Sequence, residues 1–227
     1  VVEHPWIAEI DINPLLASAQ RIIALDARVV LHPPSTAEAD LPRPAIRPYP
    51  SQYVGRWTTP SGEELTIRPI RPEDEPLMVR FHETLSDETV YARYFRYLKL
   101  NQRTAHERLT RICFIDYDRE MALVAEHRDP ATGEPEIVGV GRLSKGRGVR
   151  DAEFAVLIAD RWQHHGLGRE LLARLVEIGR AEGLERIWAE MLAGNAGMRR
   201  TSERVGFTIR PVPDDQSVVL AELAIGG

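Results

Sequence analysis

Several classes of protein are excluded by what this sequence has little of. The 227 residues include one cysteine, Cys113, so no intrachain disulfide can form and nothing indicates an oxidising compartment. No apolar run reaches the roughly 18 residues that a membrane-spanning helix requires. The 29 basic residues are outnumbered by 34 acidic ones, so the chain lacks the basic excess of sequence-independent nucleic-acid binders. We therefore expect a cytoplasmic protein that binds neither nucleic acid nor a membrane.

Composition divides the chain into three parts. Residues 1–32 are apolar and regular, and residues 52–227 have the patterning of one compact α/β unit. Between them, residues 33–51 contain six of the sixteen prolines. Proline lacks an N–H and restrains the preceding residue, so this segment is predicted to be an extended linker. The chain opens at Val1 without an initiator Met or a leader pattern, and we expect it to be part of a larger polypeptide.

Hydrophobic periodicity predicts a mixed sheet with helices on both faces. The run from Phe154 to Ala159 does not alternate, which is typical of a strand covered on both faces. Strands are predicted at 64–69, 121–126, 137–143, 153–159 and 186–191, with two short strands after Phe207. Helices are predicted to open at Pro72, to span 86–98, to run from Leu167 until Gly183 stops it, and to span 195–205.

The strand-to-helix junction at residues 158–172 has the clearest functional pattern. Gly166 and Gly168 lie in the turn, and glycine lets the backbone approach a ligand closely. The first amides of a helix have no partners within the helix, and with the helix dipole they attract anions. No lysine follows the glycines, which excludes the nucleotide phosphate loop, and the spacing is not that of the dinucleotide fingerprint. The turn therefore predicts an anion site, although both glycines could serve the turn alone.

The motif Gln163-x-x-Gly166-x-Gly168 after an apolar strand resembles the acyl-CoA pyrophosphate loop of the GNAT superfamily of N-acetyltransferases. The resemblance extends from about residue 60 to the end of the chain. Asn195-x-x-Met198, followed by the segment 205–207, is similar to the second cofactor-binding helix of that family. The resemblance implies an α/β (α+β) fold with a GNAT-type mixed, mostly antiparallel sheet, flanked by helices on both faces and preceded by a short N-terminal fragment.

Two segments, 114–125 and 152–156, resemble a narrower branch, the Pat-type bacterial protein lysine acetyltransferases. This resemblance implies acetyl-CoA as donor and a protein lysine as acceptor. The pantetheine arm would pair with the fourth strand of the family fold. Carried over by residue, the cofactor site would comprise Val156, Leu157, Ile158, Gln163, His164, His165, Gly166, Leu167, Gly168, Arg169 and Asn195. Some of these residues also fit plainer roles, His164 and His165 as polar loop residues, Arg169 as a solvated side chain and Asn195 as a helix N-cap. No metal-ligand spacing is present.

A base is expected because a lysine with a pKa of about 10.4 costs about 4.6 kcal/mol to present as the neutral amine at pH 7. Glu153 begins the apolar strand, where we expect a partly desolvated carboxylate. The resemblance to Pat-type enzymes implies Glu153 as the catalytic glutamate. It could instead point to water or pair with an arginine. Glu190 is the rival base, with a salt bridge as its plainer role. The general acid stays open, because Thr201 and Ser202 stand in the helix where many relatives carry a tyrosine.

Three other features allow more than one interpretation. The segment 118–120 (Asp-Arg-Glu) could engage a basic acceptor or form a solvated turn. Residues 93–97 alternate basic and aromatic side chains, which favours a helix with one aromatic face on the sheet over a nucleic-acid site. Cys113 is predicted to be a small buried residue rather than a nucleophile.

The first part of the chain resembles another family. The segments 10–16 and 24–28 are similar to the end of an ATP-grasp domain from nucleoside-diphosphate-forming acyl-CoA synthetases. Asn13 and Asp26 would match Mg²⁺ ligands there, but the nucleotide lysine is absent and no metal site is predicted. Pat-type proteins fuse such a region to an acetyltransferase, so the fragment indicates a synthetase-like parent polypeptide. The resemblance to Pat-type enzymes implies acyl-CoA synthetases as acceptors. A small-molecule amine acetyltransferase, a non-catalytic acyl-CoA sensor and a ligase fragment are the alternatives.

Overall fold

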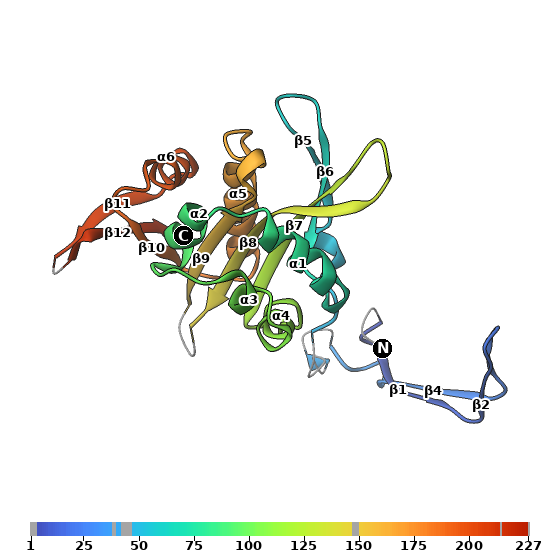
Figure 1. The fold of residues 1–227 in the computed structure, drawn as a ribbon. Coiled ribbons are helices and arrows are strands. Elements are labelled where there is room, and N and C mark those ends of the chain that lie inside the picture. The colour runs from blue at the N-terminus through green and yellow to red at the C-terminus, as the bar shows by residue number, and fades with distance from the viewer. Residues whose placement is uncertain (1–3, 38–39, 42–46, 147–149, 214, 227) are drawn as a thin grey trace. The chain divides into compact units, whose positions relative to one another are not determined.

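The computed structural model describes residues 4–37, 40–41, 47–146, 150–213 and 215–226 (Figure 1). The chain forms two compact units, Val1–Pro48 and Tyr49–Gly227. The predicted linker at 33–51 falls partly outside the described residues, at 38–39 and 42–46, and its bounds stay a prediction. Within the described residues, no helix is both long and apolar enough to cross a membrane.

The first unit contains two small antiparallel pairs of strands, which the sequence patterns did not resolve. The pairs are β1 (Ile7–Ile12) with β4 (Ala27–Leu31), and β2 (Leu15–Ala17) with β3 (Ile22–Ala24). Most of the large apolar side chains in these strands are exposed, Ile22 to 70%. Two-stranded ribbons of this kind are marginally stable by themselves, because they bury little apolar surface.

The second unit is built on an eight-stranded sheet with the order β11-β12-β10-β9-β8-β7-β6-β5. All neighbouring strands are antiparallel except β9 and β10, which are parallel. This confirms the prediction of a mixed, mostly antiparallel sheet. The strands are β5 (Gly55–Thr58), β6 (Glu64–Pro69), β7 (Glu120–Arg128), β8 (Pro135–Lys145), β9 (Asp151–Ile158), β10 (Arg186–Leu192), β11 (Thr208–Val212) and β12 (Asp215–Ala224).

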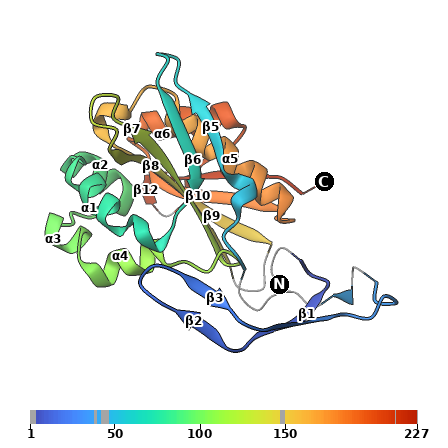
Figure 2. The same cartoon turned by 90° about the vertical axis from the view of Figure 1, so that its right-hand side faces the viewer.

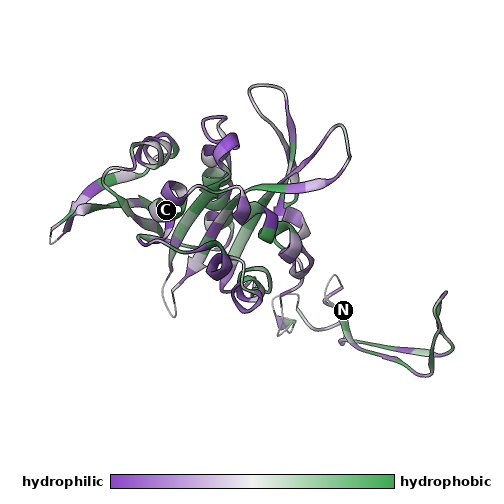
Figure 3. Ribbon diagram, in the orientation of Figure 1, coloured by the Kyte–Doolittle hydropathy of each residue, from purple (hydrophilic) through white to green (hydrophobic). Residues whose placement is uncertain are grey.

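Helices cover both faces of the sheet. The helices are α1 (Glu75–Glu83), α2 (Asp87–Tyr94), α3 (Leu100–Arg103), α4 (His106–Cys113), α5 (Leu167–Ala181) and α6 (Ala196–Val205). In Figure 2, α1–α4 lie on one side of the sheet and α5 lies on the other. Leu171 of α5 fits against Gly139 and Gly141 of β8, where a Cβ atom would come within 3.3 Å of it. The core follows the strands at the centre of the sheet, which are largely hydrophobic (Figure 3).

Three expectations need correction. The helix predicted for 86–98 ends at Tyr94, because Phe95 adopts a left-handed conformation with φ 56°. The run from Phe154 to Ala159 is not fully covered, since Val156 and Ile158 are only half-buried. The sequence patterns also missed α3, α4 and β5. Helix α4 places Leu109, Ile112 and Cys113 on one face against the core, a helical spacing that was present in the sequence and was overlooked.

Candidate active site

A gap opens in the sheet between β9 and β10. The two strands pair in parallel only from Asp151 and Arg186 to Glu153 and Trp188. Beyond this point β9 stays paired with β8 up to Ile158, and β10 stays paired with β12 up to Leu192. Facing edges of both strands are therefore left without a strand partner.

The backbone of β9 presents hydrogen-bonding groups to this gap. Ala159 donates its N–H to the carbonyl of Val138 in β8 at 2.9 Å. Successive residues of a strand direct these groups to opposite sides, so the N–H and C=O groups of Val156 and Ile158 point away from β8. Those of Leu157 point toward β8, and Leu157 borders the gap with its side chain. An extended ligand in the gap can pair with Val156 and Ile158, as an added strand would.

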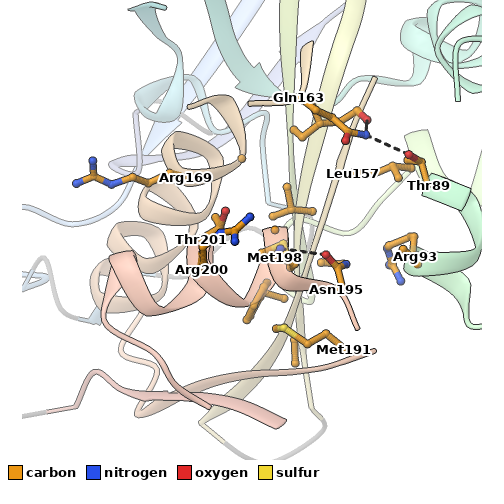
Figure 4. Close-up of a pocket in the computed structure, with 18 of the residues that line it drawn as sticks. Thr89, Arg93, Leu157, Gln163, Arg169, Met191, Asn195, Met198, Arg200 and Thr201 are labelled. Atoms are coloured by element: carbon orange, nitrogen blue, oxygen red, sulfur yellow. Dashed lines mark hydrogen bonds between the residues drawn. The ribbon is translucent and has the colours of Figure 1, made fainter. Parts of the chain in front are cut away.

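A cavity of about 1100 Å³ extends from this gap. It is bounded by α2, β9, β10, α6 and the turn between β9 and α5 (Figure 4). Of the predicted site residues, its lining includes Glu153, Val156, Leu157, Ile158, Gln163, His164, Gly166, Gly168, Arg169 and Asn195. His165 and Leu167 do not line it. His165 packs toward Trp162 instead, with ring centres 6.4 Å apart, and the side chain of Leu167 is in the core.

The turn before α5 has the conformation expected of an anion site. His164 and Gly166 have positive φ angles of 65° and 84°, and the backbone turns at these residues before α5 begins. The first helical hydrogen bond runs from the N–H of Glu170 to the carbonyl of Gly166, and no side chain caps the helix. The amides of residues 167–169 have no acceptor among the described residues. An anion bound at the N-terminus of α5 would supply a hydrogen-bond acceptor for these amides.

Gln163 and Asn195 hold their own segments in place. The side-chain amide of Gln163 donates to Thr89 Oγ1 at 3.0 Å and to the carbonyl of Ile158 at 3.3 Å (Figure 4). Thr89 also donates to Asp160 at 2.7 Å, so the start of α2 is tied to the turn. Asn195 caps α6 by accepting from the N–H of Met198 at 3.0 Å. The cap uses its oxygen, and its amide nitrogen has no partner in the described part of the chain.

Two carboxylates, Glu153 and Glu190, line the cavity. Both are exposed, so the expectation of a partly desolvated Glu153 is wrong in the chain without ligands. Glu153 lies near the beginning of β9, at the last residue of that strand that pairs with β10. Neither forms an ion pair with a described residue, so the salt bridge considered for Glu190 is not found. Burial lowers the pKa of the Arg93 guanidinium, and attraction to Glu153 partly opposes this effect.

Some cavity residues were not anticipated from the sequence. Arg93 reaches it from α2, and Arg200 and Arg204 line it from α6. The basic residues of α6, with Arg199 and Arg200 adjacent, were the signal that could have identified the helix as facing an anion. Arg169 borders the cavity, but its side chain points away from Thr201 and Met198 in Figure 4. The described residues contain no cluster of His, Cys, Asp and Glu suited to a metal ion.

Comparison with known proteins identifies the family. Residues 64–208, more than half of the chain, match the model of the acetyltransferase (GNAT) domain. The chain belongs to the GNAT acetyltransferase family. GNAT acetyltransferases use acyl-CoA as donor, and this chain is an N-acetyltransferase of that family. Residues 1–31 match the model of the ATP-grasp domain, and the first unit is an ATP-grasp fragment.

Two curated relatives are acetyltransferases. Acetyltransferase PA5475 of Pseudomonas aeruginosa is 33% identical over 165 residues, which make up 72% of this chain and 86% of that protein. Acetyltransferase Pat of Mycolicibacterium smegmatis is 27% identical over 165 residues. The match covers 73% of this chain and 47% of Pat, so the chain spans about half the length of that relative.

Solved structures agree with this family. The GNAT domain of S. lividans PAT has a TM-score of 0.68 at 25% identity, and the match covers 78% of this chain and 99% of that domain. The fold is shared with Mycobacterium smegmatis RimJ, solved in complex with CoA-disulfide, at a TM-score of 0.58 and 21% identity. That match covers 75% of this chain and 86% of RimJ. The GNAT domain of the present chain is related to Pat-type acetyltransferases.

Proposed function

We propose that this protein transfers the acetyl group of acetyl-CoA to the side-chain amine of a protein lysine, by direct attack within a ternary complex. The observation that supports this most is the end of β9–β10 pairing at Glu153 and Trp188. It leaves the backbone groups of Val156 and Ile158 facing a cavity that a carboxylate also lines. A thioester arm paired with this strand edge would lie beside that carboxylate.

The donor is bound along the length of the cavity in this proposal. The pantetheine arm pairs with Val156 and Ile158, while the side chain of Leu157 lines the path. The pyrophosphate lies on the amides of the turn at 164–169, including those of His165 and Leu167, whose side chains lie elsewhere. From the start of α6, the side-chain N–H of Asn195 donates a hydrogen bond to the CoA molecule. Arg200 and Arg204 of α6 add positive charge to the same wall of the cavity.

Glu153 is the general base in the proposed reaction. It removes the proton that the lysine ammonium must lose, and such a base contributes about 10²–10⁴ in rate. The amine then attacks the thioester carbon, and an N–H group of β9 stabilises the oxyanion. Attack forms the C–N bond and gives a tetrahedral intermediate; its collapse breaks the C–S bond, the nitrogen releases its second proton to water, and the sulfur leaves as thiolate. Thr201 lines the cavity in the helix where relatives carry a tyrosine. Water, rather than a tyrosine, therefore supplies the proton that the thiolate takes up.

The proposed acceptor is a lysine of an acyl-CoA synthetase. The relation to Pat-type enzymes and the ATP-grasp fragment at residues 1–31 support it. The test is incubation of the chain with acetyl-CoA and a panel of acyl-CoA synthetases, unrelated proteins and small amines, with thiol release and lysine mass shifts as readouts. We expect both signals together on a synthetase. Thiol release with small amines alone would contradict the protein acceptor.

A further inference from the structure

A second cavity, of about 200 Å³, adjoins the first on the face of β9 that carries α1–α4. Arg93, Tyr94, Ala155 and Leu157 line both cavities, so the two cavities are adjacent. Apolar side chains of α1, α4 and β8 provide much of the remaining wall. The second cavity therefore borders the stretch of β9 where the thioester is proposed to lie.

The second cavity is partly open to solvent and has a basic lining. Its lining includes His82, Arg93, Arg108 and Arg142, and no Asp or Glu among the described residues. Arg142 is neutralised by Glu120 at 2.5 Å. Arg93 and Arg108 form no ion pair with any described residue, and each guanidinium lies 5.0 Å from the centre of the Tyr94 ring. Two guanidinium groups thus meet at this cavity without a counter-charge in its wall.

Buried hydrogen-bonding groups at the cavity are also unsatisfied. His82 is 1% exposed, and neither of its ring nitrogens has a hydrogen-bond partner. Nε of Arg108 is buried and unpartnered as well. Buried polar atoms are nearly always hydrogen-bonded in native proteins. Burial, together with repulsion from Arg103 and Arg108, lowers the pKa of His82 to about 4, so the ring is neutral near pH 7 and has one N–H to donate. These donors are arranged for an anion.

The position of the cavity indicates where that anion comes from. Ala155 and Leu157 flank Val156, whose backbone faces the donor gap. An acyl group longer than acetyl, attached to a thioester at Val156, would extend past these side chains into the second cavity. Its 200 Å³ is several times the roughly 30 Å³ that a water molecule occupies in the liquid. Two methylenes and a carboxylate fit within that space.

We propose that the second cavity binds the distal carboxylate of a dicarboxylic acyl group, so that the enzyme also takes donors such as succinyl-CoA. Arg93, Arg108 and His82 hold the carboxylate. This inference rests on the proposed function, because it needs the thioester beside Val156. In the transfer, the C–S bond breaks, a C–N bond forms to the acceptor amine, the amine loses a proton and the CoA thiol leaves. The distal carboxylate is unchanged.

The test compares the binding of three donors by calorimetry on the full chain. Butyryl-CoA matches succinyl-CoA in carbon number and lacks the distal carboxylate, and acetyl-CoA reports on the shared part of the site. We expect succinyl-CoA to bind at least about tenfold more tightly than butyryl-CoA, the scale of hydrogen bonds to a charged group. Arg108→Gln should abolish this preference. Arg111→Gln is the matched control, because Arg111 is an exposed arginine of α4 that does not line the cavity.

The calorimetry results distinguish failure of the second-cavity proposal from failure of the proposed function. Equal affinities of the wild-type chain for the two four-carbon donors would overturn the proposal. A succinyl preference that survives in folded Arg108→Gln would overturn it too. If that variant does not fold, Ile112→Phe narrows the cavity from another side, and it should weaken both four-carbon donors more than acetyl-CoA. No binding of any donor, acetyl-CoA included, would refute the proposed function itself.

Discussion

Glu153 and Glu190 lie on the same face of the sheet, on either side of the gap between β9 and β10. Glu153 is directly opposite Trp188, and residues opposite each other in paired strands share a face. Glu190 is two residues beyond Trp188 and so points to that face as well. Both glutamates line the cavity, which makes them matched alternatives for the base.

Replacing each glutamate separately distinguishes the two alternatives. For Glu153→Gln we expect kcat to fall by about 10²–10⁴, because the acceptor ammonium loses its proton acceptor. The affinity for acetyl-CoA should stay the same, since the donor contacts lie elsewhere. Glu190→Gln should retain most of the wild-type kcat. Steady-state kinetics with an acceptor from the panel, alongside calorimetry with acetyl-CoA, measures both. The opposite pattern would assign the base to Glu190.

Gly168→Ala separates donor binding from turn formation. A Cβ at Gly168 would lie 3.9 Å from Ile158 and 4.0 Å from Thr201, so the fold has room for it. Alanine should stabilise α5 by about 0.8–1 kcal/mol over glycine. The same methyl group enters the space between β9 and α6, where the donor is proposed to bind, and acetyl-CoA should bind about tenfold more weakly. Thermal denaturation and calorimetry measure these effects. A more stable variant with unchanged affinity would leave the glycine as a turn residue only.

His82 should make the protein less stable in mild acid. Its pKa is about 4 in the folded chain against 6.5 in the unfolded chain, so the unfolded state binds the proton first as the pH falls. The stability that the neutral His82 ring contributes is present above about pH 6.5 and is lost progressively as the pH falls to about 4. At pH 5 the loss is about 2 kcal/mol in the free energy of unfolding. Urea denaturation at pH 7 and pH 5 should show that the free energy of unfolding falls less between these pH values in His82→Phe than in the wild type. An equal drop in both proteins would contradict the assignment.

Cys113 should be unreactive in the folded protein. The residue is 1% exposed, and burial raises the pKa of its thiol from 9.0 to about 12. Only the thiolate is nucleophilic, so the raised pKa alone slows alkylation near pH 8 by about 10³. Timed reaction with a thiol reagent, in buffer and in guanidinium chloride, measures the difference. Fast labelling of the folded chain would show that the core around α4 opens readily.

Much of the fold could be predicted from local sequence, because the signals there are strong. The strand at 64–69 coincides with β6, and the helix that Gly183 was expected to stop appears as α5, ending at Ala181. The end of α2 could not be predicted, because Phe95 adopts a left-handed conformation that is uncommon for residues other than glycine. Helix α4 was overlooked although Leu109, Ile112 and Cys113 recur at helical spacing, so the signal was present in the sequence.

The candidate site was predictable in its motifs and not in its geometry. The glycine turn and the Asn195 cap are local, and they formed as predicted. The exposure of Glu153 depends on where β9 and β10 separate, which no pattern within one strand reveals. The arginines of α2 and α6 reach the cavity through long-range packing. Gln163 was expected in the donor site, and its amide also binds Thr89, a residue with no motif of its own.

The hydroxyl of Thr89 ties the start of α2 to the turn between β9 and α5. It donates to Asp160 at 2.7 Å and accepts from the side-chain amide of Gln163 at 3.0 Å. The N–H of Ser86, the residue before α2, donates to the same carboxylate at 2.9 Å. Two of these three contacts depend on one hydroxyl group, so its removal would leave only the Ser86 bond of the three between the start of α2 and the turn.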